Sequence, residues 1–348
     1  MGRAAAILAL ACALPLSLTA ASVGAGPAYD HDRKELESIL DDLVAWLPGE
    51  WDNFPQIYHA RTVRMPAEGE HEPWYRTFAR IDAPQIGEYV FYGQINLGGR
   101  DGPLLGRSQL LYTAEIDEQR QVVLVRGQSP ANPEQFLNLQ DHPQLWGRVR
   151  MMDPDNIRCD FIWRRDGAQI VGVLDGPIEE RRKYGPGTCS YISPQSGKEF
   201  FADAEWALSP ELLWLYDINT LGGQQFIGRK DRTHVKLYRA SAYKCEVTDA
   251  DSTRSVAAYD RGFVAPLSAG ASSASQQPLQ WMLLRARFAA ADGFGLDEQL
   301  RLMLLPSGSM QPVAQTEAAP LAERIAIDAA GVRVSCAREA HFGPMPGG

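Results

Sequence analysis

The stretch WYRTFARIDAPQIGEYVFYGQINL, residues 74–97, decides the fold class. It contains two blocks, residues 74–82 and 89–97, in which side chains of different character alternate and aromatic and β-branched residues are common. Such alternation is typical of β-strands with two distinct faces. The segment therefore predicts two neighbouring strands. One face of the first carries Trp74, Arg76, Phe78 and Arg80, and one face of the second carries Val90, Tyr92 and Gln94.

Similar short strand signals continue on both sides, joined mostly by turns such as Asp166-Gly167 and Ser196-Gly197. Roughly ten strands at this spacing predict a mainly β protein built as an antiparallel up-and-down, calycin-like barrel. A barrel of this size leaves an interior that holds one small ligand. The further candidate strands are residues 56–65, 107–116, 121–127, 156–164, 169–174, 188–192, 198–208, 211–217 and 233–243.

A helix is expected before the strands. Leucine and other apolar residues recur at helical spacing between residues 36 and 47, Asp32 and Glu35 form a capping box, and Pro48-Gly49 ends the pattern. Its single apolar face predicts that it lies against a sheet or plugs one end of the barrel. Residues 133–146 favour a helical or irregular crossing between strands.

The chain divides after Cys245, where the composition changes. We expect a barrel domain over residues 30–245, followed by a small C-terminal β appendage within residues 246–348. Residues 267–277, rich in Ser, Ala and Gly, read as a linker or long loop. The appendage signals are residues 280–288, 299–305 and 324–337, the last broken by a turn at 329–331.

Residues 1–26 resemble a cleaved secretory signal: Arg3 precedes an apolar stretch, and small residues follow it. The stretch is shorter than a membrane span needs, and no later segment is apolar for that long. A lipoprotein signal around Cys12 is the weaker alternative. The sequence thus predicts an exported protein, periplasmic or secreted, with no membrane span in its mature chain.

Four cysteines remain after the signal: Cys159, Cys189, Cys245 and Cys336. An even number in an oxidising compartment indicates disulfides, and four cysteines allow three connectivities. We favour Cys159–Cys189 and Cys245–Cys336, because each pair would tie neighbouring strands or a tail to a body. The alternative is four unpaired buried thiols. No CxxC or His-rich spacing indicates a metal site.

Charge and motifs exclude several functions. The formal net charge of −9 argues against a nucleic-acid partner. The standard hydrolase, zinc-protease, P-loop and dinucleotide motifs are absent from the sequence, and its six histidines are scattered. The stretch LPGEWDNFPQ, residues 47–56, instead gathers polar side chains where the helix gives way to the strands. It is either a helix stop with hydrogen-bonded turn residues or a polar rim at the barrel mouth.

Four blocks of sequence resemble the CpcT/CpeT-type phycobilin chromophore lyases over about residues 35–240. The family's helix-end pattern W-x-x-G-E-[FW]-D-N-x-x-Q and its F-Y-x-E-Q strand both have counterparts, the second with Gly93 in place of Glu and followed by Arg107. The third and fourth blocks place a cysteine before a strand or hairpin. The matching residues are Trp46, Gly49, Glu50, Trp51, Asp52, Asn53, Gln56; Phe91, Tyr92, Gln94, Arg107; Cys159, Phe161, Ile162, Trp163, Gly167, Ile170, Gly172; and Cys189, Gly197, Phe200, Phe201.

The resemblance implies a calycin-type barrel that binds a linear tetrapyrrole (bilin), requires no other cofactor, and attaches the bilin to a cysteine of an acceptor protein. Such a ligand needs Arg or Lys for its propionates, an acid for its pyrrole N–H groups and aromatic faces for its π-system. Glu50 and Asp160 are the candidate acids. The candidate ligand-binding residues are Asn53, Arg64, Tyr92, Gln94, Arg107 and Trp163.

A non-catalytic function is the competing hypothesis: a periplasmic calycin-like protein that binds a hydrophobic small molecule or a protein partner. Neither hypothesis fixes the oligomeric state, and a homodimer is compatible with both. The two differ in whether a bound pigment is transferred covalently to an acceptor cysteine.

Overall fold

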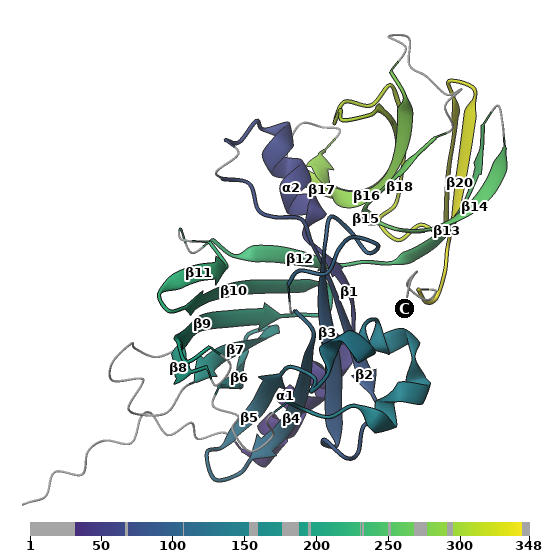
Figure 1. The fold of residues 1–348 in the computed structure, drawn as a ribbon. Helices are drawn as coiled ribbons and strands as arrows, with labels where there is room; N and C mark the ends of the chain where they lie inside the picture. Colours follow the sequence, from purple (N-terminus) through teal and green to yellow (C-terminus); the bar gives the residue numbers. More distant parts are fainter. Residues whose placement is uncertain are drawn as a thin grey trace, which may run out of the picture.

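A computed structural model describes residues 32–66, 69–106, 108–152, 159–175, 188–193, 196–229, 231, 233–249, 252–267, 277–290 and 295–342. The predicted targeting segment, residues 1–26, lies outside the described residues, as do Arg107 and residues 268–276 of the predicted linker. Strands predominate in the described part (Figure 1), which confirms the mainly β fold class.

Within the described residues, ten antiparallel strands close into a barrel. Each strand pairs with the next in chain order, and β12 returns to pair with β1, so the predicted up-and-down, calycin-like barrel is confirmed. β8 (Thr188–Ile192) lies beyond β7 along β9, and β11 (Gln224–Ile227) lies beyond β12 along β10. The barrel strands are β1 (Gly49–Asp52), β2 (Trp74–Ile81), β3 (Tyr89–Leu97), β4 (Leu110–Asp117), β5 (Val122–Gln128), β6 (Asp160–Asp166), β7 (Gln169–Asp175), β9 (Glu199–Leu208), β10 (Leu212–Leu221) and β12 (Val235–Arg239).

The N-terminal helix α1 (Arg33–Trp46) forms as predicted. The Asp32 side chain accepts a hydrogen bond of 2.8 Å from the backbone N–H of Glu35 at its first turn. The buried face of the helix joins the barrel core and packs against β4 to β7. The apolar face therefore covers the interior at one end of the barrel.

The prediction of a strand at residues 56–65 is wrong. Helix α2 (Phe54–Thr62) occupies most of this segment. Pro55 suits the first helical turn, and Ile57 and Ala60 are buried three positions apart, which is a helical rather than a β repeat. The strand that closes the barrel is instead β1, whose four residues carry too short an alternation to be recognised.

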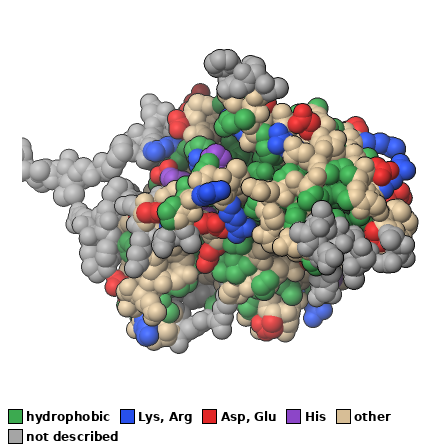
Figure 2. Space-filling view, turned by 90° about the horizontal axis from the view of Figure 1, so that it is seen from above, with side chains coloured by type: hydrophobic (Ala, Val, Ile, Leu, Met, Phe, Trp, Pro, Cys, Tyr) green, Lys and Arg blue, Asp and Glu red, His purple; other side chains and the backbone are tan. Residues whose placement is uncertain are grey.

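A second β body, which we call the C-terminal body, covers residues 242–342. Its described strands form two four-stranded sheets, β14-β13-β20-β19 and β15-β16-β17-β18, around a core of their own (Figure 1). From above, the described surface intersperses charged side chains of both signs with hydrophobic ones (Figure 2). The strands are β13 (Ala242–Thr248), β14 (Thr253–Tyr259), β15 (Arg261–Pro266), β16 (Leu279–Ala289), β17 (Leu296–Pro306), β18 (Ala314–Ala318), β19 (Arg324–Ala329) and β20 (Val332–Arg338).

The strands predicted near residues 280–288, 299–305 and 324–337 are confirmed as β16, β17 and the β19–β20 hairpin. The others in this body were not predicted. β13 runs through the expected boundary after Cys245, so the chain passes from barrel to C-terminal body at residues 240–242.

Both favoured disulfides are formed. Cys159 and Cys189 have Cα atoms 5.6 Å apart, and Cys245 and Cys336 lie opposite each other on β13 and β20. Disulfides of this kind fit a protein that folds in an oxidising compartment. None of the helices in the described residues is both long and apolar enough to cross a membrane.

The predicted irregular crossing at residues 133–146 consists of three short 3₁₀ helices: η2 (Pro133–Phe136), η3 (Leu139–Asp141) and η4 (Pro143–Arg148). Their apolar side chains pack on the outward side of β2 and β3. That side of the barrel wall is therefore buried as well as the interior side.

Candidate functional site

The LPGEWDNFPQ segment anchors α2 and the closing strands. The Asn53 amide accepts a hydrogen bond from the backbone N–H of Trp74 and donates one to the carbonyl of Glu72, both of 2.8 Å. The Gln56 amide bonds the backbone of His234 and Lys236 in the same two-sided way. These are the contacts expected of hydrogen-bonded turn residues, the first of the two alternatives for this segment.

The strand register collects polar residues of β1, β2 and β3 in two adjacent rows on the outward side of the barrel. Trp51, between the two polar residues of β1, points into the core instead. η3 and the C-terminal body cover these rows, which we call the outer polar rows. They consist of Glu50, Thr77 and Gln94, and of Asp52, Tyr75 and Asn96.

Tyr92 and Gln94, both predicted to bind ligand, lie in a hydrogen-bonded network on this outward side. The Tyr92 hydroxyl donates to Gln94 Oε1 at 2.7 Å, and Gln94 Nε2 donates to Asn96 Oδ1 and Asn138 Oδ1, each at 2.8 Å. All four residues are buried. Their polar groups are thus used between the barrel wall and the crossing rather than facing the interior.

Glu50, a predicted candidate acid, belongs to the outer polar rows. The Thr77 hydroxyl donates to its carboxyl at 2.5 Å. Burial raises the pKa of Glu50 to about 7, against smaller lowering effects of Thr77 and Arg100. Burial likewise raises the pKa of Asp52 to about 8, although its carboxyl accepts the N–H of Phe54 at 2.6 Å.

The remaining predicted residues are dispersed. Asp160, the other candidate acid, pairs with Arg126 at 3.1 Å and with Arg120 at 3.5 Å in a partly exposed cluster. Arg64 is exposed just after α2. Arg107 lies outside the described residues. Trp163 alone among the predicted set is a buried interior side chain, packed edge-on against Trp206.

The barrel interior is largely filled by aromatic side chains around one arginine. The Arg76 guanidinium contacts the rings of Phe78 and Trp206, 4.5 and 4.4 Å from their centroids. Its Nη2 donates to the Tyr112 hydroxyl at 2.9 Å. The side chain is only 3% exposed. The interior is therefore apolar in bulk but holds a buried positive charge, stabilised by contact with two aromatic rings.

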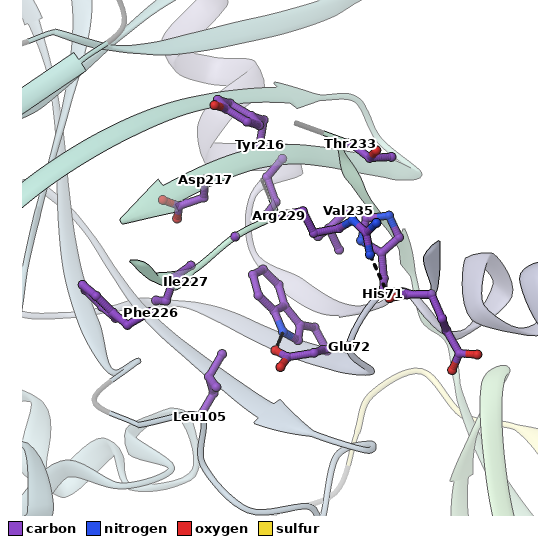
Figure 3. A pocket seen from close by; sticks show the side chains of 14 residues that line it. His71, Glu72, Leu105, Tyr216, Asp217, Phe226, Ile227, Arg229, Thr233 and Val235 are labelled. Atoms are coloured by element: carbon purple, nitrogen blue, oxygen red, sulfur yellow. Dashed lines mark hydrogen bonds between the residues drawn. The ribbon is translucent and has the colours of Figure 1, made fainter. Parts of the chain in front are cut away.

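A cavity of about 220 Å³ opens at the end of the barrel away from α1. We call it the mouth cavity. Trp74, one inward position before Arg76, forms part of its wall, and Asp217 of β10 and Phe226 of β11 face it from other directions (Figure 3). The full lining is Glu70, His71, Glu72, Trp74, Leu105, Leu215, Tyr216, Asp217, Phe226, Ile227, Gly228, Arg229, Thr233 and Val235.

Asp217 is a half-buried acid of the mouth cavity. Desolvation raises its pKa to about 6, while Arg76 and a hydrogen bond of 2.5 Å from Asn219 lower it. Arg229, at the rim, is already committed to Asp231 and to the carbonyl of Glu70. Among the described residues, no group of three or more His, Cys, Asp or Glu side chains is placed to hold a metal ion.

Sequence reasoning did not select the residues of this cavity. The alternation at residues 74–82 did place Arg76 on the same face as Trp74 and Phe78, which was the available signal. Asp217 ends the predicted strand 211–217, but nothing local shows that it meets Arg76, because that depends on how β10 and β2 curve around the barrel. Phe226 lies in a strand that was not predicted.

The fold is a calycin-like barrel with the mouth cavity at one end. No family model matches the chain, and no curated protein matches it. Among solved structures, the chain is similar to the CRL protein of Arabidopsis, with a TM-score of 0.40 and 12% identity, over 59% of this chain and 97% of that one.

Proposed function

We propose that this protein is a ligand-binding barrel whose site is the mouth cavity and whose ligand is a linear tetrapyrrole. The observation that supports the proposal is the combination, in one opening, of apolar and aromatic side chains with the carboxyl of Asp217, whose pKa is raised. Ligand sites in barrels are commonly apolar clefts with a few polar groups that fix the orientation of the ligand. Asp217 would accept hydrogen bonds from the pyrrole N–H groups.

Size sets how such a ligand would enter. Pockets that enclose a whole drug-sized ligand usually have roughly 300–1,000 Å³, and the mouth cavity has about 220 Å³. A tetrapyrrole would therefore insert one end and lay the remainder against the rim. Phe226 stands at that rim with 56% of its surface exposed, and its ring is 6.2 Å from Phe200. Both aromatic faces suit an extended π-system.

Chromophore lyase activity is the second candidate, and Asp217 favours it. Addition of an acceptor thiol across the ethylidene double bond forms a C–S bond at one carbon and places the proton on the conjugated system. The protein would orient the pigment and supply a proton donor. A carboxyl with a pKa of about 6 is suited to that task, whereas Glu50 and Asp160 lie on the outward side of the barrel.

The first experiment titrates the full chain with biliverdin and records its visible spectrum. We expect a red-shifted, intensified band that saturates. Phe226→Ala should weaken binding roughly 10-fold, by the 1–2 kcal/mol that a stacked aromatic contributes. Trp214→Ala is the matched control, because Trp214 is an exposed aromatic at 38% that faces outward on β10, against Lys236.

An unchanged spectrum at saturating pigment would reject the tetrapyrrole and leave the alternative, a barrel for another hydrophobic molecule or a protein partner. If the band appears, a cysteine-bearing acceptor peptide is added. Pigment that stays extractable from the peptide under denaturing conditions counts against a lyase and in favour of a binding protein.

A further inference from the structure

Three hydrogen-bond donors inside the barrel have no acceptor among the described residues. They are Nε of Arg76 and the indole N–H groups of Trp163 and Trp206. The rings of Trp206 and Trp163 lie 6.4 Å apart, and Arg76 stacks on Trp206, so the donors belong to one group of contacting side chains. Buried polar groups are normally satisfied, so three unpaired donors and no unpaired acceptor in one place need an explanation.

Within the described part of the chain, Arg76 also makes no ion pair. Its Nη2 donates a hydrogen bond to the neutral hydroxyl of Tyr112. Asp217 acts on Arg76 through space, yet the two make no ion pair, and the Asp217 carboxyl bonds Asn219 instead. A buried charge is costly unless it is paired. The two rings offset part of this cost but leave Nε of Arg76 without an acceptor.

The position of Arg76 connects it to the mouth cavity. It follows Trp74 by two residues on β2, so it is the next inward-facing side chain below the cavity wall. Asp217 both lines the cavity and interacts electrostatically with Arg76. Arg76 does not itself line the cavity; it lies one inward position deeper than Trp74 and within the electrostatic influence of Asp217, both of which do line it.

We infer that Arg76 is an oxyanion receptor for the ligand, and that the barrel selects elongated apolar or aromatic molecules that carry a carboxylate. This inference rests on the proposed ligand site at the mouth. A guanidinium edge matches a carboxylate in geometry, and contacts with the Phe78 ring, the Trp206 ring and the Tyr112 hydroxyl hold the guanidinium in place. A bound carboxylate would supply the acceptors that the interior lacks.

Asp217 sets the pH dependence of this site. When ionised, it repels an incoming carboxylate; when protonated, it no longer does so. The charged groups that face Asp217 are Arg76 and, on β9, Asp203, and Asn219 adds a neutral hydrogen bond. Carboxylate binding should therefore tighten as pH falls from 8 to 5.

The test measures equilibrium binding to the full chain with two matched probe pairs: decanoate with decan-1-ol, and biliverdin with its dimethyl ester. At pH 5 we expect each acid to bind roughly 10- to 100-fold more tightly than its neutral partner, as charge-assisted hydrogen bonds imply. Arg76→Met should reduce this preference to within about twofold. Arg80→Met is the matched control, because Arg80 lies exposed on the same strand over the ring of Tyr89.

Asp217→Asn keeps the size of the side chain and provides an independent readout if Arg76→Met fails to fold. It should tighten decanoate binding at pH 8 several-fold and flatten its pH dependence. Equal affinity of acid and neutral probes for the wild-type chain, or no tightening in Asp217→Asn, would overturn the inference.

The outcomes separate the inference from the proposed function. Biliverdin and its ester bound equally well would leave the function standing without the receptor. Decanoate bound in an Arg76-dependent way, with no binding of biliverdin, would retain the receptor and reject the tetrapyrrole. If neither pair binds, both proposals fail.

Discussion

Buried polar side chains lie on both sides of the barrel wall formed by β1, β2 and β3, but their hydrogen bonding differs. On the outward side, Gln94 and Asn96 have partners in the wall, the crossing and a neighbouring loop, and of the six outer-row residues Tyr75 is the one whose polar group has no hydrogen-bond partner in the described part of the chain. On the inward side, Arg76 and two tryptophans keep donors unpaired. Satisfied buried polar groups fix a structure, whereas unpaired ones next to a cavity indicate a ligand that completes them.

The comparison changes how the family-like residues are interpreted. Glu50, Asp52, Tyr92 and Gln94 belong to the outward side, where the crossing and the C-terminal body cover them. These residues are polar because they form hydrogen bonds where the crossing and the C-terminal body pack on the barrel wall. The inward residues carry the proposals on function: Asp217, which lines the mouth cavity, and Arg76, which lies below it.

Asn53→Ala has the largest expected effect on stability, and it tests the hydrogen bonds that we interpret as structural. The change removes two hydrogen bonds and leaves without them the buried N–H of Trp74 and the partly buried carbonyl of Glu72. Unfolding free energy should fall by roughly 2–5 kcal/mol, because each unsatisfied buried group costs about 1–3 kcal/mol. Urea denaturation measures it. Asn132→Ala, at an exposed asparagine without a capping bond, should change stability by less than about 0.5 kcal/mol.

Gly172→Ala tests the inward side. A Cβ at this position would lie 2.5 Å from the Trp163 ring, so the ring must shift within a filled interior. We expect a loss of about 1–3 kcal/mol in unfolding free energy, as for other overpacked cores, and weaker ligand binding through the displaced Trp163. Gly147→Ala, where a Cβ meets open space, is the control. Equal stability of the two variants would show that the Trp163 ring can move aside at no cost, so that the interior is less tightly packed than the structure indicates.

The same comparison explains how far the sequence could predict this molecule. Alternation identified β2 and β3 and the side chains that share each face. It could not show which face is interior, because both are buried: all of residues 90–96 of β3 are inaccessible. A strand with one solvent-exposed face would have revealed its orientation.

The other features that the sequence did not predict depend on contacts between distant parts of the chain, which form when the barrel closes. The pairing of β1 with β12 joins residues nearly 190 positions apart, and a four-residue strand has no local signal that predicts it. The interaction of Asp217 with Arg76 likewise exists only after the barrel has closed. At residues 56–65 a local helix signal was present, Pro55 at the start of α2, and in the folded protein it prevails over the β pattern assigned to this segment.

Asp52→Asn should change the pH dependence of the unfolding free energy, by a smaller amount per pH unit and in a direction that the pKa determines. The pKa of Asp52 is about 8 in the folded protein, against an ordinary value of 3.8. The folded state therefore holds a proton that the unfolded chain releases above pH 4. The stability contribution of this carboxyl is fully present below about pH 4 and is lost as pH rises towards 8, by up to about 1.4 kcal/mol per pH unit.

Wild-type stability should consequently fall between pH 5 and pH 8, and Asp52→Asn should fall less steeply, because an amide has no proton to lose and its oxygen can still accept the N–H of Phe54. Urea midpoints across this pH range measure the slope. Asp82→Asn, at an exposed position, should retain the wild-type slope. Glu50→Gln, whose carboxyl has a pKa of about 7, should reduce the slope up to pH 7 but not above it. Identical slopes in all four proteins would mean that water reaches the outer polar rows, which would weaken their contrast with the interior.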